Sequence, residues 1–434
     1  YKVCLLRKVV KVPMMSFVYA GLLAVSLLAL PEVSTWAKDQ HTHVYQDCIC
    51  SCGDLEYLDE DDQTVILSDS RLSDLGLYGT DVVIPSEVVL DGTSYTVVGI
   101  GAAAFQNHTE VETVTLPDTI TTLCDFCFNG CTNLRTIALP EGVMTIGTAA
   151  FQLCSSLETI DLPDNLQTLG NFAYNHCPAV QNTEVVIPDG LLQIGLGAEG
   201  VTHLFYDVGT DAQFSRFVVS DASESFSVID DCLYTKDGSV LLAIPRGKVF
   251  SDGVYEMPDS VTRLAELSFS RNPSVHTVVL SDNLCVSDLL TDLQMRAFNN
   301  RTNELNGAVY GYAGVTRYET KSSNRYHTAV DGVLYTKHMN WITAVPLQYA
   351  GVLDVPEGVT VWPSGVLWPD VSYFEGQALD QITEIRIPAS LWVMQDTQLA
   401  AINQLVDLYG TVVTVDEQNQ AFAVSLDGHL EYLL

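Results

Sequence analysis

The chain has 434 residues, of which 47% are apolar, and its formal net charge is −34. This apolar content is that of a folded protein, while so acidic a surface repels nucleic acid and anionic lipid. The composition therefore excludes a nucleic-acid-binding protein, and the length fits either two or three ordinary domains or one long repeat array with insertions.

Residues 1–37 have the pattern of an export signal. Basic residues up to Lys11 precede an apolar run over residues 14–30, and residues 35–37 offer a small-x-small cleavage site. The alternative is an uncleaved anchor helix, because an apolar run of about 17 residues is near the lower limit for crossing a bilayer. We therefore expect a secreted or cell-surface protein.

The next segment, residues 38–54, is a polar leader that contains histidines and cysteines at alternate positions. These residues are His41, His43, Cys48, Cys50 and Cys52. A metal site is one interpretation, although structural zinc sites usually use Cys-x-x-Cys pairs. The other is a flexible leader or a local disulfide. The second interpretation is preferred, so we predict no metal site and no cofactor.

Residues 55–99 are predicted as an N-terminal β cap. The short apolar runs at residues 65–67 and 82–84 are typical of strands. Such strands would cover the apolar edge that the first unit of a repeat array otherwise exposes.

Residues 100–200 repeat regularly with a step of 23 residues. An aromatic ring recurs at Phe105, Phe128, Phe151 and Tyr174 with that step. Periodicity in this range is the signature of a solenoid, in which each unit buries its apolar face against its neighbours. We call each unit a coil, and the residues that are one period apart a column.

Each unit contains the strand pattern of a leucine-rich repeat. In Leu134-x-x-Ile137-x-Leu139 the apolar side chains alternate inward, and Pro140 closes the strand because it cannot donate a ladder hydrogen bond. The predicted fold class is a leucine-rich-repeat solenoid that is mostly β. It has one short parallel strand in each repeat of about 23 residues, with turns or short helical segments between strands and β-hairpin insertions.

The residues of one unit also carry a family resemblance. Residues 146–163, with Ala149-Ala150-Phe151, Cys154 and the strand pattern that follows, resemble the repeat of the BspA-like bacterial surface leucine-rich-repeat proteins. The Pro-Glu-Gly-Val segments at 140–143 and 356–359 match it as well. The resemblance implies a secreted or surface-attached binding solenoid without a catalytic centre, whose repeats are interrupted by hairpins.

Cys131, Cys154 and Cys177 share one column, and Asn272 takes the same place in a later unit. Repeat proteins of this type place Asn or Cys there to satisfy buried turn amides. Although eleven cysteines in an exported protein would normally suggest disulfides, we predict that these three form a reduced, buried ladder.

Beyond the regular repeats the period breaks. An insertion with a β-hairpin is predicted over 201–253, and the repeat resumes over 254–290. A second insertion with a hairpin spans 291–350, because the pattern around Leu233-Tyr234-Thr235-Lys236 recurs at 334–337. Residues 351–434 are predicted as irregular repeats and a third hairpin, truncated before its return strand pairs.

The outward strand positions form the candidate binding face. Strands of adjacent units lie about 4.8 Å apart, so these positions align across the sheet. The candidates are Glu112, Thr113, Arg135, Thr136, Glu158, Thr159, His276, Thr277, Glu384 and Arg386. The alternative is that these charges and threonines only stabilise their cross-strand neighbours.

No catalytic motif is present, since the chain has no Gly-x-Ser-x-Gly elbow, no His-Glu-x-x-His and no glycine-rich phosphate loop. We predict a non-enzymatic protein that binds an extracellular protein or glycan, with adhesin-like binding to host or matrix proteins in view. The second hypothesis is a structural stalk that presents a C-terminal module absent from this sequence. No nucleic-acid partner is expected, and the membrane is involved only through the signal or an anchoring segment.

Overall fold

The structure is a computed structural model that describes residues 57–59, 63–69, 76–90, 92–194, 214–265, 272–284, 315–346, 348–363 and 380–433, together with residues 73, 268, 366 and 367. The predicted signal at 1–37 and the leader at 38–54 lie outside the described residues. Within the described part, no helix has the length and hydropathy needed to cross a bilayer.

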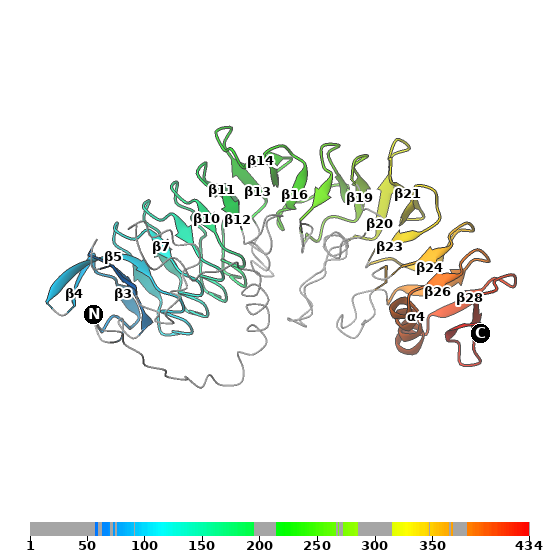
Figure 1. Ribbon diagram of the computed structural model, residues 1–434, viewed down its shortest axis with the longest axis horizontal. Helices are drawn as coiled ribbons and strands as arrows, with labels where there is room; N and C mark the ends of the chain where they lie inside the picture. Colours follow the sequence, from blue (N-terminus) through cyan, green and yellow to red (C-terminus); the bar gives the residue numbers. More distant parts are fainter. Residues whose placement is uncertain are drawn as a thin grey trace, which may run out of the picture. The chain divides into compact units, whose positions relative to one another are not determined.

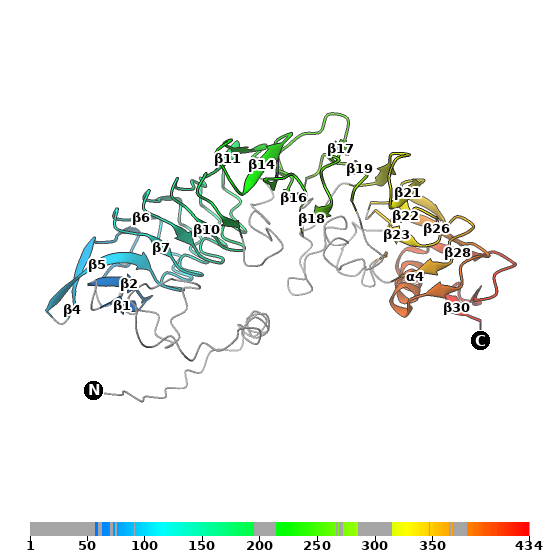
Figure 2. The same cartoon turned by 45° about the horizontal axis from the view of Figure 1, so that its top comes forward.

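The regular coils stack through two rows of short parallel strands (Figures 1 and 2). The first row contains β3 (Asp81–Val83), β6 (Thr113–Thr115) and β8 (Thr136–Ala138). The second row contains β7 (Thr122–Leu123), β9 (Thr145–Ile146), β10 (Thr168–Leu169) and β12 (Gln193–Ile194). The predicted mostly-β leucine-rich-repeat solenoid is confirmed, and the second row adds a strand that the sequence pattern does not indicate.

Strands of the predicted N-terminal cap pair with the same two rows. β1 (Tyr57–Asp59) is antiparallel to β2 (Thr64–Leu67), and β2 pairs in parallel with β5 (Thr93–Ile100). β4 (Glu87–Leu90) adds an antiparallel partner to β5, and β5 pairs in parallel with β7. β2 and β3 pair in parallel with β5 and β6, as strands of the repeats do. The pairing therefore does not mark where the cap ends and the repeats begin, and the boundary predicted at residue 99 stays a prediction.

The interior of the coils is built around a column of stacked rings. Phe105, Phe128, Phe151 and Tyr174 are buried, and successive ring centroids lie 5.1, 5.4 and 5.1 Å apart with interplanar angles of 12° or less. One coil is nearly a translated copy of the last, so equivalent rings are superposed in parallel instead of meeting edge to face. The column is a shared core in which each ring is covered by its neighbours.

Two backbone positions of every regular coil adopt left-handed φ angles. One column has Ala103, Phe126, Ala149 and Phe172 with φ between 54° and 59°. The other has Asn107, Gly130, Leu153 and His176 with φ between 59° and 75°. Only one of these eight residues is glycine, although positive φ is costly for most other residues. The repeated packing around each turn therefore fixes a conformation that the local sequence does not favour.

Among the described residues, three groups of antiparallel strands follow the regular coils, and each group begins with a β-hairpin. β14 (Phe226–Ile229) pairs with β15 (Cys232–Thr235), and β21 (His327–Val330) pairs with β22 (Val333–Thr336). Both turns have two consecutive residues with positive φ, which is the type I′ geometry that matches strand twist.

The third hairpin corrects the sequence prediction of a truncated strand pair. β29 (Phe422–Val424) pairs with β30 (Leu430–Tyr432), with Phe422 opposite Tyr432. The turn closes through Gly428, whose φ is 89° and whose N–H donates to the Ser425 carbonyl. The return strand therefore begins at Leu430 and is already paired within the chain.

Each hairpin follows a group of parallel strands of the first-row type. The first pair is β11 (Glu184–Ile187) with β13 (Arg216–Val219), which precedes β14. The second group is β17 (Val254–Glu256), β19 (Thr277–Leu280) and β20 (Arg317–Thr320), and the third is β24 (Gly351–Asp354), β26 (Ile382–Ile387) and β28 (Val412–Val415). The leucine-rich architecture thus continues beyond the regular repeats, as the sequence predicts.

The second row also continues between the hairpins. Its strands are β16 (Val240–Ala243), β18 (Arg263–Leu264), β23 (Ile342–Ala344), β25 (Val361–Trp362) and β27 (Val393–Met394). β16 pairs with β18 and β25 with β27, both in parallel. Trp362 in β25 is fully buried.

One α-helix, α4 (Asp396–Tyr409), replaces the usual turns of a coil near the C-terminus (Figure 1). Gly410 ends it in the left-handed conformation, with φ of 69°, as helix C-caps commonly do. Asn403 on the helix pairs with both the N–H and the carbonyl of Leu430, at 2.7 and 3.0 Å. The helix therefore holds the third hairpin in place.

Candidate contact face

The outward side of the first strand row carries three of the predicted binding residues in one line. The N–H of Arg135 donates to the Glu112 carbonyl at 2.8 Å, and the N–H of Glu158 donates to the Arg135 carbonyl at 3.0 Å. The three side chains therefore occupy equivalent positions on consecutive coils. We call the outward side of β3, residues 112–115 (with β6), residues 135–138 (with β8), residues 158–161, β11 and β13 the strand face.

The side chains of this line are partly paired with one another. The Arg135 guanidinium forms an ion pair with Glu158 at 3.0 Å, across the coil spacing. The exposed fractions of the two side chains are 61% and 37%, so solvent screens the pair and its contribution to stability is about 0–1 kcal/mol. Arg216 pairs with Glu184 in the same way on β13 and β11. These ion pairs agree with the stabilising interpretation and leave the rest of the face exposed.

A second line on the strand face is made of hydroxyl side chains. Thr113 lies opposite both Asp81 and Thr136, and its hydroxyl donates to the Asp81 carboxylate at 2.7 Å. Thr159 is exposed on the following coil. The predicted six-residue group, from Glu112 to Thr159, is thus brought together on three adjacent coils.

Strand geometry is interrupted on the third of these coils by Asn182. Its side-chain amide accepts from the N–H of Ile160 and donates to the carbonyl of Ile160, both at 2.8 Å. The Asn182 side chain therefore forms the two hydrogen bonds with Ile160 that the backbone of an adjacent strand would form in a regular sheet. The line of outward side chains continues past this point, because the N–H of Gln181 donates to the Glu158 carbonyl at 2.9 Å.

The four remaining candidates belong to later sheets. His276 and Thr277 lie on the sheet of β17, β19 and β20, where Thr277 is opposite Val254 and Arg317. Glu384 and Arg386 lie on β26 and pair with each other at 2.9 Å, which lowers the pKa of Glu384 through the hydrogen bond from Arg386. The structure does not bring these four into one group with the first six.

The predicted cysteine ladder forms hydrogen bonds between coils. The thiols of Cys131, Cys154 and Cys177 each donate to the backbone carbonyl of the stacked phenylalanine one coil earlier. The sulfur–oxygen distances are 3.0, 3.2 and 3.2 Å, and the acceptors are Phe105, Phe128 and Phe151. The acceptors are carbonyl oxygens, whereas the sequence prediction named turn amides in general. All three thiols are free and fully buried.

An asparagine fills the same role in later units. The Asn272 side chain donates to the carbonyls of Pro245 and Lys248 at 2.7 and 2.9 Å. Asn324 and Asn419, which sequence reasoning missed, do the same before the second and third hairpins, and each also accepts two backbone N–H groups of its own loop. The only sequence signal is their position, three residues before the first strand of each hairpin.

The thiol ladder should be chemically inert. Burial raises the pKa of Cys131 and of Cys177 to about 12, so the reactive thiolate is scarce at neutral pH. We expect all three ladder cysteines to resist a maleimide in the native protein and to label fully after denaturation, mapped cysteine by cysteine with mass spectrometry. Rapid native labelling, or a disulfide among the three, would contradict this assignment.

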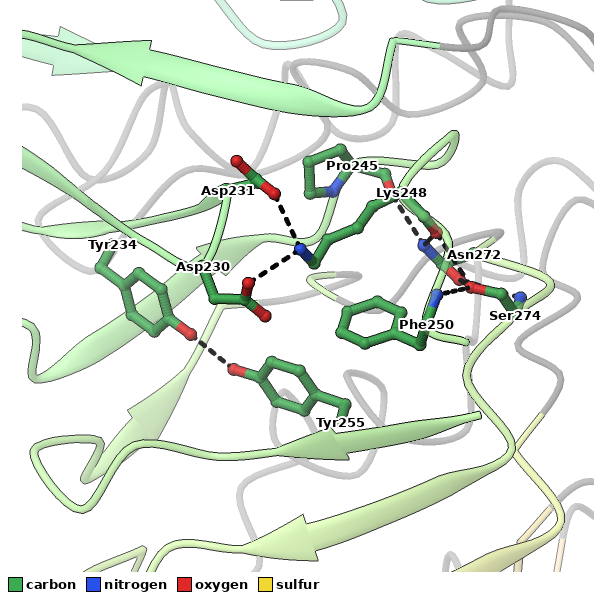
Figure 3. Close-up of polar contacts among 9 residues, drawn as sticks. All are labelled: Asp230, Asp231, Tyr234, Pro245, Lys248, Phe250, Tyr255, Asn272 and Ser274. Atoms are coloured by element: carbon green, nitrogen blue, oxygen red, sulfur yellow. Dashed lines mark hydrogen bonds and ion pairs between the residues drawn. The ribbon is translucent and has the colours of Figure 1, made fainter. Parts of the chain in front are cut away.

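A buried lysine, Lys248, is paired with two aspartates that are more exposed, at the first hairpin (Figure 3). Lys248 Nζ lies 3.1 Å from Asp230 Oδ1 and 2.9 Å from Asp231 Oδ2, and 5.1 Å from the ring centroid of Phe250. Burial alone would lower the pKa of Lys248, but the hydrogen bonds to Asp231 and Asp230 outweigh it and the pKa is raised. The charged lysine therefore fixes the hairpin turn to the following loop, and no sequence spacing signals it.

Comparison with known families agrees with this architecture. Residues 94–198 match the family described as the BspA type leucine rich repeat region, in six copies. This segment contains the aromatic column, the cysteine ladder and most of the strand face. No curated protein sequence matches the chain.

Several solved structures are similar to the chain at low identity. A leucine-rich cell surface protein from Faecalibacterium prausnitzii is 18% identical, with 83% of this chain and 92% of that one covered and a TM-score of 0.46. The pneumococcal vaccine antigen PcpA is 16% identical, with 79% and 90% covered and a TM-score of 0.46. A leucine-rich repeat protein of T. pallidum is 22% identical, with 52% and 81% covered and a TM-score of 0.30.

Proposed function

We propose that this chain, whose residues 94–198 are BspA-type leucine-rich repeats, is a non-enzymatic protein that is secreted or displayed at the cell surface and binds an extracellular protein. A protein-interaction role is the one that the repeat family suggests. The signal-like residues 1–37 support export. Adhesin-like binding to host or matrix components, including glycans, is the specific form that we propose.

The strand face is the observation that carries this proposal. Its side chains come from consecutive coils in fixed register, so they present one extended and mostly polar surface, on which Val83 and Val186 are also exposed, and the core determines its geometry. Arg135 and Thr136 are exposed at the centre of this surface. Binding residues that are held by a rigid scaffold lose little entropy when a partner docks.

The proposal is tested by changing the central line of the face. We expect the variant Glu112→Ala, Arg135→Ala, Glu158→Ala to remain folded and to lose at least about tenfold in affinity for its partner, because it removes one ion pair and three contact side chains. The measurement is binding of residues 38–434 to a panel of immobilised extracellular matrix and serum glycoproteins. Circular dichroism reports whether the fold is kept.

The control variant changes an exposed line on the opposite row of strands. Met144→Ala, Gln167→Ala, Leu192→Ala alters exposed residues that precede β9, β10 and β12 on three consecutive coils. It should bind as the original protein does. If the strand-face variant also binds normally, the contact surface lies elsewhere. If no member of the panel binds at all, the stalk hypothesis is favoured.

A further inference from the structure

The stretch over residues 72–215 is almost devoid of positive charge. Between Arg71 and Arg216, Arg135 is the only lysine or arginine, whereas residues 72–215 contain 17 aspartates and glutamates. With one basic and 17 acidic residues, this stretch has a net charge of −16, and it is the lack of cations that leaves most of its carboxylates without counter-charges.

Both arginines of the strand face are already neutralised. Arg135 is paired with Glu158 and Arg216 with Glu184. Among the described residues, the other carboxylates of the face have no cationic partner; these are Asp81, Glu112 and Asp161. Five carboxylates against two guanidinium groups leave the face with a net charge of −3. An acidic partner could bind these two arginines only if their ion pairs with Glu158 and Glu184 were broken.

A further line of carboxylates follows the prolines that close the strands. Asp118, Glu141, Asp164 and Asp189 each come directly after such a proline and are exposed. The N–H of Asp164 donates to the Glu141 carboxylate at 3.1 Å, so members of this line on consecutive coils are in contact range. We call these four residues the acidic ridge. It follows each face strand by two or three residues and adds four negative charges beside the strand face.

The spacing of these charges makes them act together. Adjacent coils are about 4.8 Å apart, which is shorter than the Debye length of about 8 Å at physiological ionic strength. Salt therefore screens the mutual repulsion of the carboxylates only in part. A partner that places several cations along the face relieves this repulsion and gains electrostatic steering as it approaches.

We propose that the strand face of the first coils, bordered by the acidic ridge, docks a basic segment of a partner protein, rich in lysine or arginine. The inference rests on the proposed function and names the chemistry of the partner. Charge complementarity selects this occupant. An acidic protein or nucleic acid is repelled, and a neutral glycan gives the unpaired carboxylates no counter-charge.

The test uses the purified chain and a short lysine homopolymer, with a glutamate homopolymer as the negative probe. The lysine polymer should bind at low ionic strength and weaken strongly toward about 0.15 M salt, while the glutamate polymer should not bind. The variant Asp81→Asn, Glu112→Gln, Asp161→Asn should lower the affinity for the lysine polymer about tenfold. It should also make that affinity depend less steeply on salt concentration. Asparagine can still accept the Thr113 hydroxyl, so the fold should be kept.

A matched control removes the same charge elsewhere. Asp221→Asn, Glu224→Gln, Glu417→Gln neutralises three exposed carboxylates in the loops that precede the first and third hairpins. It should leave binding within about twofold, because distant charges are screened. If the two variants lost the same affinity for the lysine polymer, the docking site would be wrong. The binding would then be only a non-specific attraction to an acidic protein. If the lysine polymer fails to bind while a panel protein still needs the strand face, the basic partner is wrong and the proposed function stands.

Discussion

Replacing Phe128 with alanine is expected to lower the free energy of unfolding by about 4 kcal/mol, since large-to-small changes of buried aromatic residues cost about 3–5 kcal/mol. Phe128 is fully buried and stacks on Phe105 and Phe151 at 5.1 and 5.4 Å. Its loss leaves a cavity between two coils and removes two ring contacts, each worth about 0.5–1.5 kcal/mol beyond area burial. Urea unfolding followed by circular dichroism measures the change.

The matched control for this experiment is Met144→Ala. Met144 lies in the coil that follows the Phe128 ring and is 41% exposed, so its truncation should cost less than about 1 kcal/mol. Similar midpoints for the two variants would mean that the ring column does not hold the coils together.

Gly170→Ala is expected to destabilise the repeats by about 3 kcal/mol or more, because overpacking against backbone cannot be relieved by a side-chain rotation. A Cβ at Gly170 would lie 2.3 Å from the backbone nitrogen of Thr148 and 2.4 Å from the carbonyl carbon of Gly147. The adjacent coils would have to separate, which breaks contacts in both rows of strands. The shift of the urea midpoint measures this cost.

Gly190→Ala is the control, because a Cβ there meets only the Asp164 and Leu166 carbonyls at 3.6 and 3.7 Å. These are ordinary contact distances, so alanine should be neutral or slightly stabilising, by up to about 1 kcal/mol through a less flexible unfolded chain. If Gly170→Ala were as stable as Gly190→Ala, the close approach of the coils would not be required for folding.

The sequence predicts the core of the coils well because each column repeats a physical requirement. The stacked rings, the buried thiols and the strand that ends before Pro140 all recur with one step, and a recurring requirement is visible without a structure. The order of outward residues on the first three coils follows from the same step. Whether those residues bind a partner is a separate question, which the experiments above address.

Other features leave no periodic trace. The second-row strands β7, β9, β10 and β12 of the regular coils are two residues long. The left-handed positions hold residues such as Phe126 and Leu153 that do not favour that conformation. The helix α4 lies where the repeat spacing was expected to continue, although Gly410 and the good helix formers before it are signals that could have revealed it. Asn182 and Lys248 act through partners that are far away in sequence, so only the folded chain shows their roles.

The ladder of thiol hydrogen bonds gives the regular coils a direction under mechanical load. Each cysteine donates to a backbone carbonyl 26 residues earlier, so a carbonyl of each coil is hydrogen-bonded by the thiol of the coil that follows it. A force applied to the C-terminal end should detach the last coil first and expose the next carbonyl only afterwards, since each coil contacts mainly its neighbours. Peeling one coil would release about 80 Å of extended chain. The chain would therefore lengthen in regular steps under load, and the coils would re-form one at a time when the load falls.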